Sequence, residues 1–548
     1  MWRAFTILAC APHGPYGRGT LNATRHNMQT LMTHGRLLWV DDEVNMLKAH
    51  LIFLEKKGYE VVTTTNGYDA IELCQQMDFD LVLLDENMPG LSGLETLQRI
   101  KDMRPDLPVV MVTKSEEENI MNQAIGAKIA DYLIKPVNPN QILLTLKKNI
   151  HKSEIVAEAA QTGYRQDFSR IGTQISDSLT PEEWKDVYRR LVHWELEPAL
   201  SGGPMGEMLA MQKEEANQAF AKFVRRHYAG WIADPDTRPM MSMDVMRRTV
   251  LPLLDAGQKV LLLVIDNFRY DQWRVFSHEL ADDFNITEDL YFSILPTVTQ
   301  YARNALFAGL TPARIRQLYP SLWVDEEEEE GKNLNEEQLI SLLLQRLRRR
   351  ERFAYHKLQT AQAAAQFMQT RFAQLRDVDL AVVVINFIDM LSHARTELNM
   401  VRELAANEAA YRAVTLSWLK HTSVQALFRA LAESDFTIVL TTDHGSIRVN
   451  TPSRVVGERN LNTNLRYKVG RQMSYNNREV FEVRNPAEAG LPAPKLSSTY
   501  IFATGSRFFV YPNNLNHYVQ YYQDTFQHGG LSMEEMIVPL VTLRPRRR

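Results

Sequence analysis

Three strongly apolar runs between residues 259 and 442 of this 548-residue chain each lead into an aspartate. The runs and their aspartates are 259–265 with Asp266, 380–386 with Asp389, and 436–442 with Asp443. Runs this apolar are typical of buried parallel strands. Because the carboxyl ends of parallel strands meet at one edge of a sheet, the three carboxylates are expected to lie together.

Three histidines accompany these aspartates. His393 follows Asp389 by four positions, so on a helical turn the two side chains face the same way and can share one ion. His444 directly follows Asp443, and in an irregular loop this pair could serve two ions, or one ion and its neighbour. His528 precedes two glycines late in the chain. Mixed His and Asp ligands favour Zn²⁺, although Mn²⁺ phosphomutase chemistry uses overlapping ligand types.

A candidate nucleophile lies in the segment PTVTQYARNALFAGL, residues 296–310, which has the pattern of a loop entering a helix. The amide groups at such a helix start can hold an anion. A metal-coordinated hydroxyl, here that of Thr299, can attack phosphorus. The simpler alternative is that Thr299 only caps the helix. Sulfatase chemistry is disfavoured because neither cysteine, Cys10 or Cys74, lies in this segment.

A second set of polar residues follows the predicted strands 37–40, 81–84, 109–112 and 132–134. These residues are Asp41 and Asp42, then Asp85 with Asn87 beyond it, then Thr113, then Lys135. Carboxylates at one sheet edge make a hard oxygen site suited to Mg²⁺. The ion and Lys135 would neutralise a phosphoryl group on Asp85, and Thr113 could donate a hydrogen bond to it.

The elements that position these residues predict an α/β protein with four parts. Strands and amphipathic segments alternate from residue 35, which indicates a parallel sheet covered by helices. No strand pattern survives from 153 to about 258. There, Thr180 followed by Pro181 and Glu183 marks a helix start, and Trp184 opens an apolar stripe typical of a helical bundle. The predicted parts are a disordered N-terminal extension (1–34), a first α/β domain (35–152), a helical bundle coupler (153–250) and a large α/β domain (251–548).

Composition restricts the function classes. The chain is 45% hydrophobic and 23% charged with a net charge of -4, so it has no global basic field for nucleic acid or membranes. The coupler shows no basic recognition helix, which argues against a plain transcription factor. Two cysteines and the absence of an apolar run of ~18 residues are typical of a cytoplasmic protein.

The segment 35–152 resembles the flavodoxin-like receiver domains of response regulators. This resemblance implies that a sensor histidine kinase phosphorylates Asp85. It also implies that Mg²⁺ is bound by Asp42, Asp85 and the backbone at Asn87, and that Tyr132 is a switch residue beside Lys135. Lys114 occupies a position where small residues are common in receiver domains, and this difference is expected to change the lifetime of the phosphoryl group on Asp85.

The segment 251–543 resembles the alkaline phosphatase superfamily, in particular PglZ domains, and the whole layout is similar to PorX-like response regulators of Bacteroidetes. The resemblance implies two zinc ions and Thr299 as nucleophile. The implied ligands of the first ion are Asp266, Thr299, Asp443 and His444; those of the second are Asp389, His393 and His528.

The phosphate clamp differs from that of related nucleotide pyrophosphatases, which carry an Asn three positions after the nucleophile. Ala302 occupies that position here, followed by Arg303 and Asn304, which are the candidate substrate contacts of this segment. The segment 459–468 offers further substrate contacts, or is a solvated surface. Its candidate residues are Asn462, Asn464, Arg466 and Tyr467.

The resulting hypothesis is a phosphorylation-controlled zinc phosphodiesterase acting on nucleotides or on linear or cyclic oligonucleotides. Resemblance to PorX-like proteins adds a role in type IX secretion, an alternative sigma factor as partner, and a homodimer when phosphorylated. The alternative is a non-hydrolytic output module that binds a ligand or sigma factor and has a structural zinc site.

Overall fold

The computed structural model divides the chain into two compact units, residues 1–156 and 157–548. It describes residues 34–114, 129–150, 152–175, 179–200, 203–325, 331, 333–397, 405–458, 461–495, 497–513 and 515–546. Residues 1–33 of the predicted N-terminal extension therefore lie outside the described residues.

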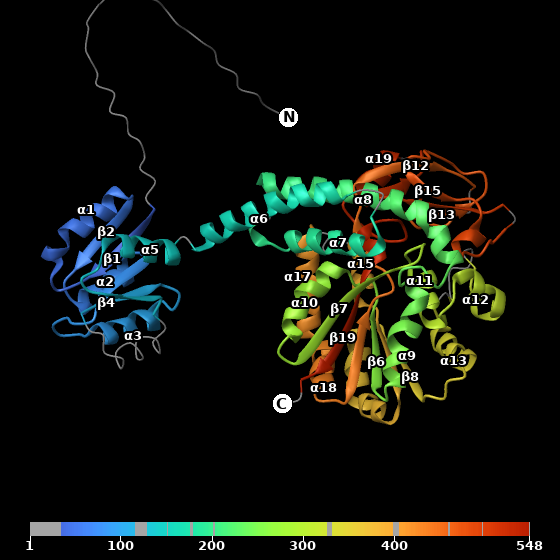
Figure 1. The fold of residues 1–548 in the computed structure, drawn as a ribbon, viewed down its shortest axis with the longest axis horizontal. Helices are drawn as coiled ribbons and strands as arrows, with labels where there is room; N and C mark the ends of the chain where they lie inside the picture. Colours follow the sequence, from blue (N-terminus) through green and yellow to red (C-terminus); the bar gives the residue numbers. More distant parts are fainter. Residues whose placement is uncertain are drawn as a thin grey trace, which may run out of the picture. The chain divides into compact units, whose positions relative to one another are not determined.

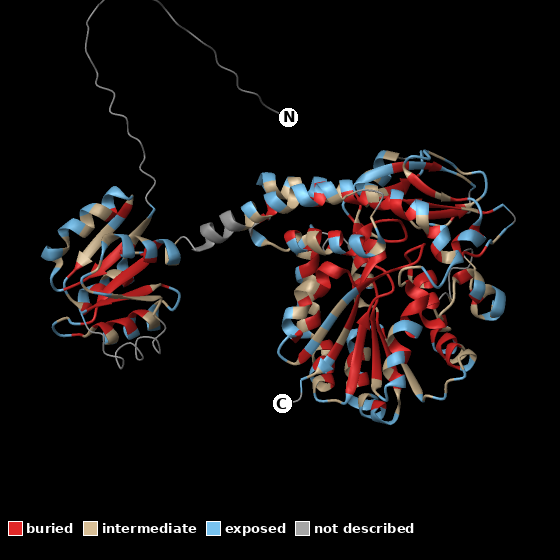
Figure 2. Ribbon diagram, in the orientation of Figure 1, coloured by how far each residue is buried: buried red, intermediate tan, exposed pale blue. Residues whose placement is uncertain are grey.

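The first unit contains a five-stranded parallel sheet with the order β2-β1-β3-β4-β5. Its strands are β1 (Gly35–Val40), β2 (Tyr59–Thr64), β3 (Leu81–Asp85), β4 (Val109–Thr113) and β5 (Asp131–Ile134). The described helices are η1 (Val44–Leu47), α1 (Lys48–Lys56), α2 (Gly67–Gln76), α3 (Gly93–Met103) and α5 (Pro139–Ile150). Separate apolar clusters line the two faces of the sheet, and Figure 2 shows β3 and β4 as buried. The predicted doubly wound α/β fold is confirmed.

Helix α6 (Lys152–Gln174) begins in the first unit and continues into the second, where α7 (Pro181–Glu195) and α8 (Gly203–Ala233) follow. Helix α7 begins as predicted, with Thr180 and Glu183 forming a reciprocal capping box around Pro181. The buried stripe that starts at Trp184 joins a single hydrophobic core that extends through the large α/β domain. The coupler helices are therefore packed onto that domain.

The large domain is built on a six-stranded sheet with the order β7-β19-β10-β6-β9-β8. Its strands are β6 (Lys259–Ile265), β7 (Phe284–Phe292), β8 (Phe353–Leu358), β9 (Leu380–Ile385), β10 (Phe436–Thr441) and β19 (Ile537–Pro545). The four strands β10, β6, β9 and β8 are parallel to one another; β19 pairs antiparallel with β10, and β7 pairs antiparallel with β19, so β19 alone runs in the opposite direction. In Figure 1 helices α10 (Tyr270–Leu280) and α17 (Glu408–His421) lie on one side of these strands, and α11 (Thr299–Ala308) and α13 (Glu336–Arg346) on the other. The three predicted apolar strands are confirmed at the centre of this sheet.

Smaller sheets beyond the main sheet carry the late segments of the chain. One has the order β13-β16-β15, with β13 (Tyr467–Gly470), β15 (Val480–Val483) and β16 (Thr499–Ala503). Another has the order β14-β12-β17, with β12 (Thr451–Val456), β14 (Ser474–Tyr475) and β17 (Arg507–Val510). A two-stranded sheet pairs β11 (Ile447–Arg448) with β18 (Phe526–Gln527), and this pairing brings His528 back toward the segment after β10.

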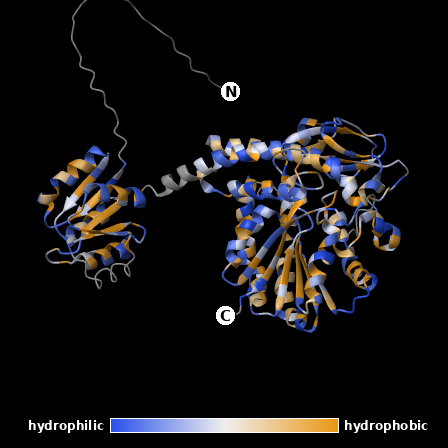
Figure 3. Cartoon of the chain, viewed as in Figure 1, coloured by the Kyte–Doolittle hydropathy of each residue, from blue (hydrophilic) through white to orange (hydrophobic). Residues whose placement is uncertain are grey.

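The remaining described elements complete the second unit. They are η2 (Pro198–Leu200), η3 (Ser242–Asp244), η4 (Met246–Val250), α9 (Leu251–Asp255), α12 (Pro312–Leu318), η5 (Pro320–Leu322), α14 (Ala361–Thr370), η6 (Phe372–Asp377), α15 (Phe387–Glu397), α18 (Ser423–Ala432), η7 (Pro486–Ala489), α19 (Leu515–Tyr522) and α20 (Met533–Met536). Apolar residues concentrate in the strands (Figure 3). Among the described helices, none combines the length and apolar character needed to cross a membrane.

Candidate metal centre and phosphoacceptor site

The ends of β6, β9 and β10 lie level in the main sheet. Ile265 pairs with Ile385, and Thr441 pairs with Val264, so the residues that follow the three strands emerge at one edge. The register brings Asp266 and Asp443 together there, although they are far apart in sequence. Both carboxylates are fully buried.

Helix α11 delivers Thr299 to this edge. The residue that caps the helix is Val298, which makes no side-chain cap, and Thr299 is the first helical residue. Its Oγ1 lies 3.4 Å from Asp266 Oδ1 and 3.3 Å from His444 Nε2. The hydroxyl is therefore directed at the acidic cluster and does not cap its own helix.

Asp266, Asp443 and His444 form a compact set of potential metal ligands. One ligand atom from each lies within 4.8 Å of the others. His444 Nε2 is 3.7 Å from Asp266 Oδ1 and 3.8 Å from Asp443 Oδ2. Asp443 Oδ2 is buried and accepts no hydrogen bond from the described residues. A buried, unsatisfied carboxylate oxygen beside an imidazole nitrogen fits a bound cation.

The electrostatics of this set are consistent with that fit. Burial raises the pKa of Asp266 well above its usual range; Arg303 counters this shift and Asp443 adds to it. Burial lowers the pKa of His444 to about 4, so its imidazole is neutral near pH 7. A neutral imidazole is the form that binds a metal ion.

Asp389 and His528 form a second pair beside the first set. His528 Nε2 lies 3.3 Å from Asp389 Oδ1. The ring of His528 stacks on that of His444, with centroids 4.4 Å apart and an interplanar angle of 16°. The backbone of His393 belongs to α15, as does Asp389, but the His393 side chain lies outside the described part of the structure. The structure thus brings six of the seven predicted zinc ligands to one place.

Three polar contacts of Thr297 hold the His528 loop against the segment that precedes Thr299. The Thr297 hydroxyl donates to Gly530 O over 2.9 Å and accepts from Gly529 N over 3.0 Å. His528 Nδ1 is 3.2 Å from Thr297 O, which leaves Nε2 directed toward Asp389. A backbone partner on one ring nitrogen fixes which nitrogen can bind a metal.

Arg303 lies beneath the carboxylates and is fully buried. Its Nη1 is 2.8 Å from Asp266 Oδ2, and its Nε donates to Glu336 Oε1 over 2.6 Å. The Arg303 guanidinium therefore neutralises the Asp266 carboxylate and holds it in place; because it is buried, it does not make the predicted contact with a substrate. Asn304, the next residue, is also buried, with 3% exposure.

The structure places the candidate substrate segment close to the His528 loop. Asn464 Nδ2 donates to His528 O over 3.2 Å, and Asn462 Nδ2 donates to Tyr467 O over 3.4 Å. Arg466 is fully buried and makes a two-pronged ion pair with Glu535, whose closest distance is 2.5 Å. Residues 459–460 of the predicted segment lie outside the described residues.

Sequence reasoning missed several polar residues of this centre. Asn267 has a left-handed backbone with φ of 60°, and its Nδ2 lies 3.4 Å from Asp389 Oδ1. Asn386 Nδ2 donates to Asp266 Oδ2 over 3.0 Å. Asn386 directly follows β9, and Asn267 is separated from the end of β6 by one residue; these positions behind apolar strands are the signal that could have found them. Glu336 begins a helix far from any motif and gave no such signal.

The sheet edge of the first unit gathers Asp41, Asp42 and Asp85, with one carboxylate oxygen of each within 4.8 Å of the others. Lys135 Nζ lies 2.6 Å from Asp41 Oδ2 and 2.8 Å from Asp85 Oδ2. Burial raises the pKa of Asp85, although Lys135 acts against that shift. Thr113 is buried at the end of β4. The three carboxylates fit a hard divalent cation such as Mg²⁺.

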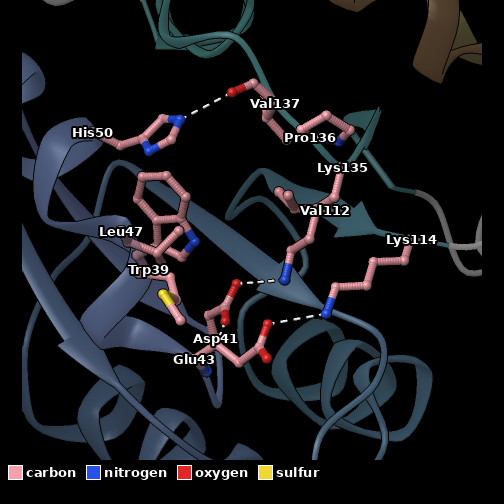
Figure 4. Close-up of a pocket in the computed structure, with 11 residues that line it drawn as sticks. Trp39, Asp41, Glu43, Leu47, His50, Val112, Lys114, Lys135, Pro136 and Val137 are labelled. Atoms are coloured by element: carbon pink, nitrogen blue, oxygen red, sulfur yellow. Dashed lines mark hydrogen bonds and ion pairs between the residues drawn. The ribbon is translucent and has the colours of Figure 1, made fainter.

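An apolar cavity of about 410 Å³ opens beside this edge, and Trp39, Val112 and Pro136 are among its lining residues (Figure 4). At its rim Lys114 Nζ forms an ion pair of 2.9 Å with Glu43. Tyr132 lies half-buried on β5, and Asn87 is exposed beyond β3.

Known proteins similar to this chain match its first part. The transcriptional regulatory protein ResD of Bacillus subtilis is 29% identical over 174 residues, which are 28% of this chain and 69% of ResD. The response regulator SaeR of Staphylococcus epidermidis is 34% identical over 131 residues, 23% of this chain and 56% of SaeR, so the chain spans only about half of that relative. A CheY-like receiver domain protein from Methanospirillum hungatei, solved by crystallography, is 29% identical, covering 22% of this chain and 95% of that chain with a TM-score of 0.21.

Family models match three consecutive parts of the chain. Residues 37–147 match the response regulator receiver domain, and residues 154–232 match the PorX response regulator linker domain. Residues 245–543, more than half of the chain, match the BREX system PglZ alkaline phosphatase-like domain. A receiver domain implies a sensor histidine kinase as partner. The chain therefore belongs to the PglZ alkaline phosphatase-like family and has the architecture of a PorX-like response regulator.

Proposed function

We propose that this response regulator, phosphorylated on Asp85, controls a zinc-dependent phosphodiesterase that acts on nucleotides or on short linear or cyclic oligonucleotides. The observation that carries the proposal is the position of Thr299. Its hydroxyl is 3.4 Å from a carboxylate oxygen of Asp266 and 3.3 Å from His444 Nε2, within the set of potential metal ligands. A module that only binds a ligand has no need of a hydroxyl in this position.

The chain's residues divide into two ligand groups around the hydroxyl. Asp266, Asp443 and His444 would hold one zinc together with Thr299. Asp389 and His528, with His393, would hold the other. Two bound zinc ions would lower the pKa of the Thr299 hydroxyl and would stabilise the negative charge on the phosphate oxygens.

The reaction then has two displacement steps. The Thr299 hydroxyl loses its proton to solvent, and its Oγ1 forms a bond to phosphorus while the ester P–O bond to the leaving alcohol breaks. The departing alkoxide takes a proton from water. A water molecule next attacks the phosphothreonine diester, the P–Oγ1 bond breaks, and Thr299 recovers its proton.

The charges around the site favour diesters over monoesters. A monoester dianion needs extra positive charge at the site, whereas a diester carries one negative charge. The two arginines that the sequence offered, Arg303 and Arg466, are both fully buried and paired with acids. Tyr467 lies beside Tyr301, with ring centroids 6.2 Å apart, in the segment next to His528. Both rings are buried, so this aromatic pair packs inside the domain and offers no exposed face to a nucleoside.

A threonine series tests the catalytic role. Thr299→Ala should retain most of its zinc but lose cleavage of bis-p-nitrophenyl phosphate and of a short oligonucleotide, because the other ligands remain. Thr299→Ser should keep measurable cleavage. Thr360→Ala, which removes a threonine from the start of another helix, α14, is the matched control and should cleave normally. If Thr299→Ala retains zinc and cleaves as fast as the wild type, Thr299 is not the nucleophile. If the wild type binds zinc but cleaves neither substrate, the non-hydrolytic output module is favoured.

The cellular role in the proposal rests on the similarity to PorX-like regulators. We propose that the chain acts in the control of type IX secretion, receives its phosphoryl group from a sensor histidine kinase, contacts an alternative sigma factor, and forms a homodimer when phosphorylated. Phosphorylation on Asp85 is supported by its contact with Lys135 and by the adjoining carboxylates.

A further inference from the structure

A continuous chain of buried ion pairs runs from the coupler helices into the large domain. It begins at Glu195, the last residue of α7, whose Oε1 lies 2.8 Å from Arg412 Nη1 on α17. The same Arg412 nitrogen is 3.0 Å from Asp271 Oδ2 on α10. Asp271 in turn pairs with Arg269 at 2.5 Å, and Arg269 also pairs with Glu408 at 2.5 Å. Arg269 and Asp271 are almost completely buried.

Arg269 touches the segments that carry the predicted metal ligands. It lies three residues after Asp266, and its Nη1 is 3.4 Å from the carbonyl oxygen of Ser446, two residues after His444. Its guanidinium also lies over the ring of Phe526, 5.2 Å from the centroid, two residues before His528. One side chain therefore braces the loops of both imidazoles that stack at the metal centre.

A second arm joins α8 to the same region. Lys213 Nζ is 2.6 Å from Glu195 Oε2 and 3.3 Å from Glu534 Oε1. Asn217, one helical turn further along α8, donates to Glu534 Oε2 over 3.0 Å and accepts from Met533 N over 2.8 Å. Glu534 and Met533 belong to α20, which follows the His528 loop. Glu195 is thus the point where both arms meet.

We infer that the chain Glu195–Arg412–Asp271–Arg269 is a positioning relay, through which helices α7 and α8 hold the loops of His444 and His528 in the geometry that binds metal. The inference rests on the proposed function and deepens it, because it assigns the coupler helices a direct part in the metal centre. Buried charges of this kind hold a fixed geometry only while every partner is present.

The acidic members of the relay are themselves a poor metal site. Oxygens of Glu195, Asp271 and Glu408 lie within 4.8 Å of one another, which alone resembles a cation site. Three cations already neutralise them: Arg269, Arg412 and Lys213. The group acts on the metal centre through Arg269 and the loops it contacts.

Glu195→Gln tests the relay in the full-length protein. The variant should fold, because Arg412 keeps Asp271 and Lys213 keeps Glu534 as acidic partners. Asp289→Asn is the matched control. It breaks ion pairs of 3.0 Å to Arg189 and 3.7 Å to Lys185, which also join α7 to the large domain, but through β7 and away from the histidine loops.

Zinc affinity, measured by competition with a chelating dye, should fall about tenfold in Glu195→Gln, as is typical when groups behind metal ligands are lost. It should change less than about twofold in Asp289→Asn. In Arg412→Met the affinity should fall similarly, and Arg412→Lys should recover part of it. Hydrogen exchange of the zinc-free protein should be faster at residues 443–446 and 526–530 in Glu195→Gln than in Asp289→Asn.

Equal zinc affinity and equal exchange in Glu195→Gln and Asp289→Asn would overturn the relay, whatever the wild-type activity. If the wild type itself binds no zinc, the proposed function fails, and the hydrogen exchange of the two segments still decides the inference. A fall in melting temperature shared by both variants, without the difference in exchange, would show that Glu195 has only a structural role.

Discussion

Thr299 and His444 lie 145 positions apart in the chain, yet Thr299 Oγ1 and His444 Nε2 are only 3.3 Å apart. The first residue starts helix α11, and the second follows strand β10 by three positions. Their contact exists because the helix start and the strand end meet at one sheet edge. This contact is the basis for assigning chemistry to a hydroxyl that could otherwise be a simple helix cap.

Removing single ligands should lower the zinc content of the purified protein. We expect about two zinc ions per chain in the wild type, and less in Asp266→Ala, His528→Ala and His393→Ala when measured by plasma mass spectrometry. Asp435→Ala is the control, because Asp435 directly precedes the same strand, β10, whose other end leads to Asp443. Full zinc occupancy in Asp266→Ala would refute the ligand assignment.

The buried Lys468 should make stability depend on pH. Burial lowers the pKa of this ammonium to about 8, against about 10.4 in an unfolded chain. Between these values the unfolded state binds more protons, so the free energy of unfolding of the wild type rises with pH relative to Lys468→Met. The advantage of Lys468→Met over the wild type should therefore shrink by about 2 kcal/mol between about pH 7.5 and about pH 9.5.

Urea denaturation at several pH values measures this change, with the exposed Lys222→Met as the control. A pH-independent difference between Lys468→Met and the wild type would show that the Lys468 side chain is not buried in solution.

Phosphorylation should require Asp85. Acetyl phosphate with Mg²⁺ should add one phosphoryl group to the wild type, seen by intact mass, and should shift its sedimentation toward a dimer. Asp85→Asn should show neither change, because the acceptor oxygen is lost, while Asp102→Asn on the exposed side of α3 should behave as the wild type. A phosphorylated Asp85→Asn protein would place the acceptor elsewhere.

The main architecture could be predicted because the sequence signals are local. The runs that became β6, β9 and β10 are almost entirely apolar, as is typical of buried parallel strands, and polar residues follow their ends. The start of α7 followed from Thr180, Pro181 and Glu183, whose roles depend only on neighbouring residues.

The supports of the site could not be predicted, because they depend on packing between distant segments. Arg303 seemed available to a substrate until its partners, Asp266 and Glu336, were placed around it. Arg466 likewise pairs with Glu535, 69 positions away. A periodic pattern in the sequence can show that a residue lies on a buried face. It does not show which acidic side chain will form an ion pair with that residue.

The comparison of a diester with a monoester tests the central claim most directly. With the zinc-loaded full-length protein, kcat/KM for bis-p-nitrophenyl phosphate should exceed that for p-nitrophenyl phosphate by more than about tenfold, which needs only about 1.4 kcal/mol of differential transition-state stabilisation. The reason is that Arg303 and Arg466 are already paired with acids, which leaves little positive charge for a dianion. A higher kcat/KM for the monoester would contradict the phosphodiesterase, even if both zinc ions were found.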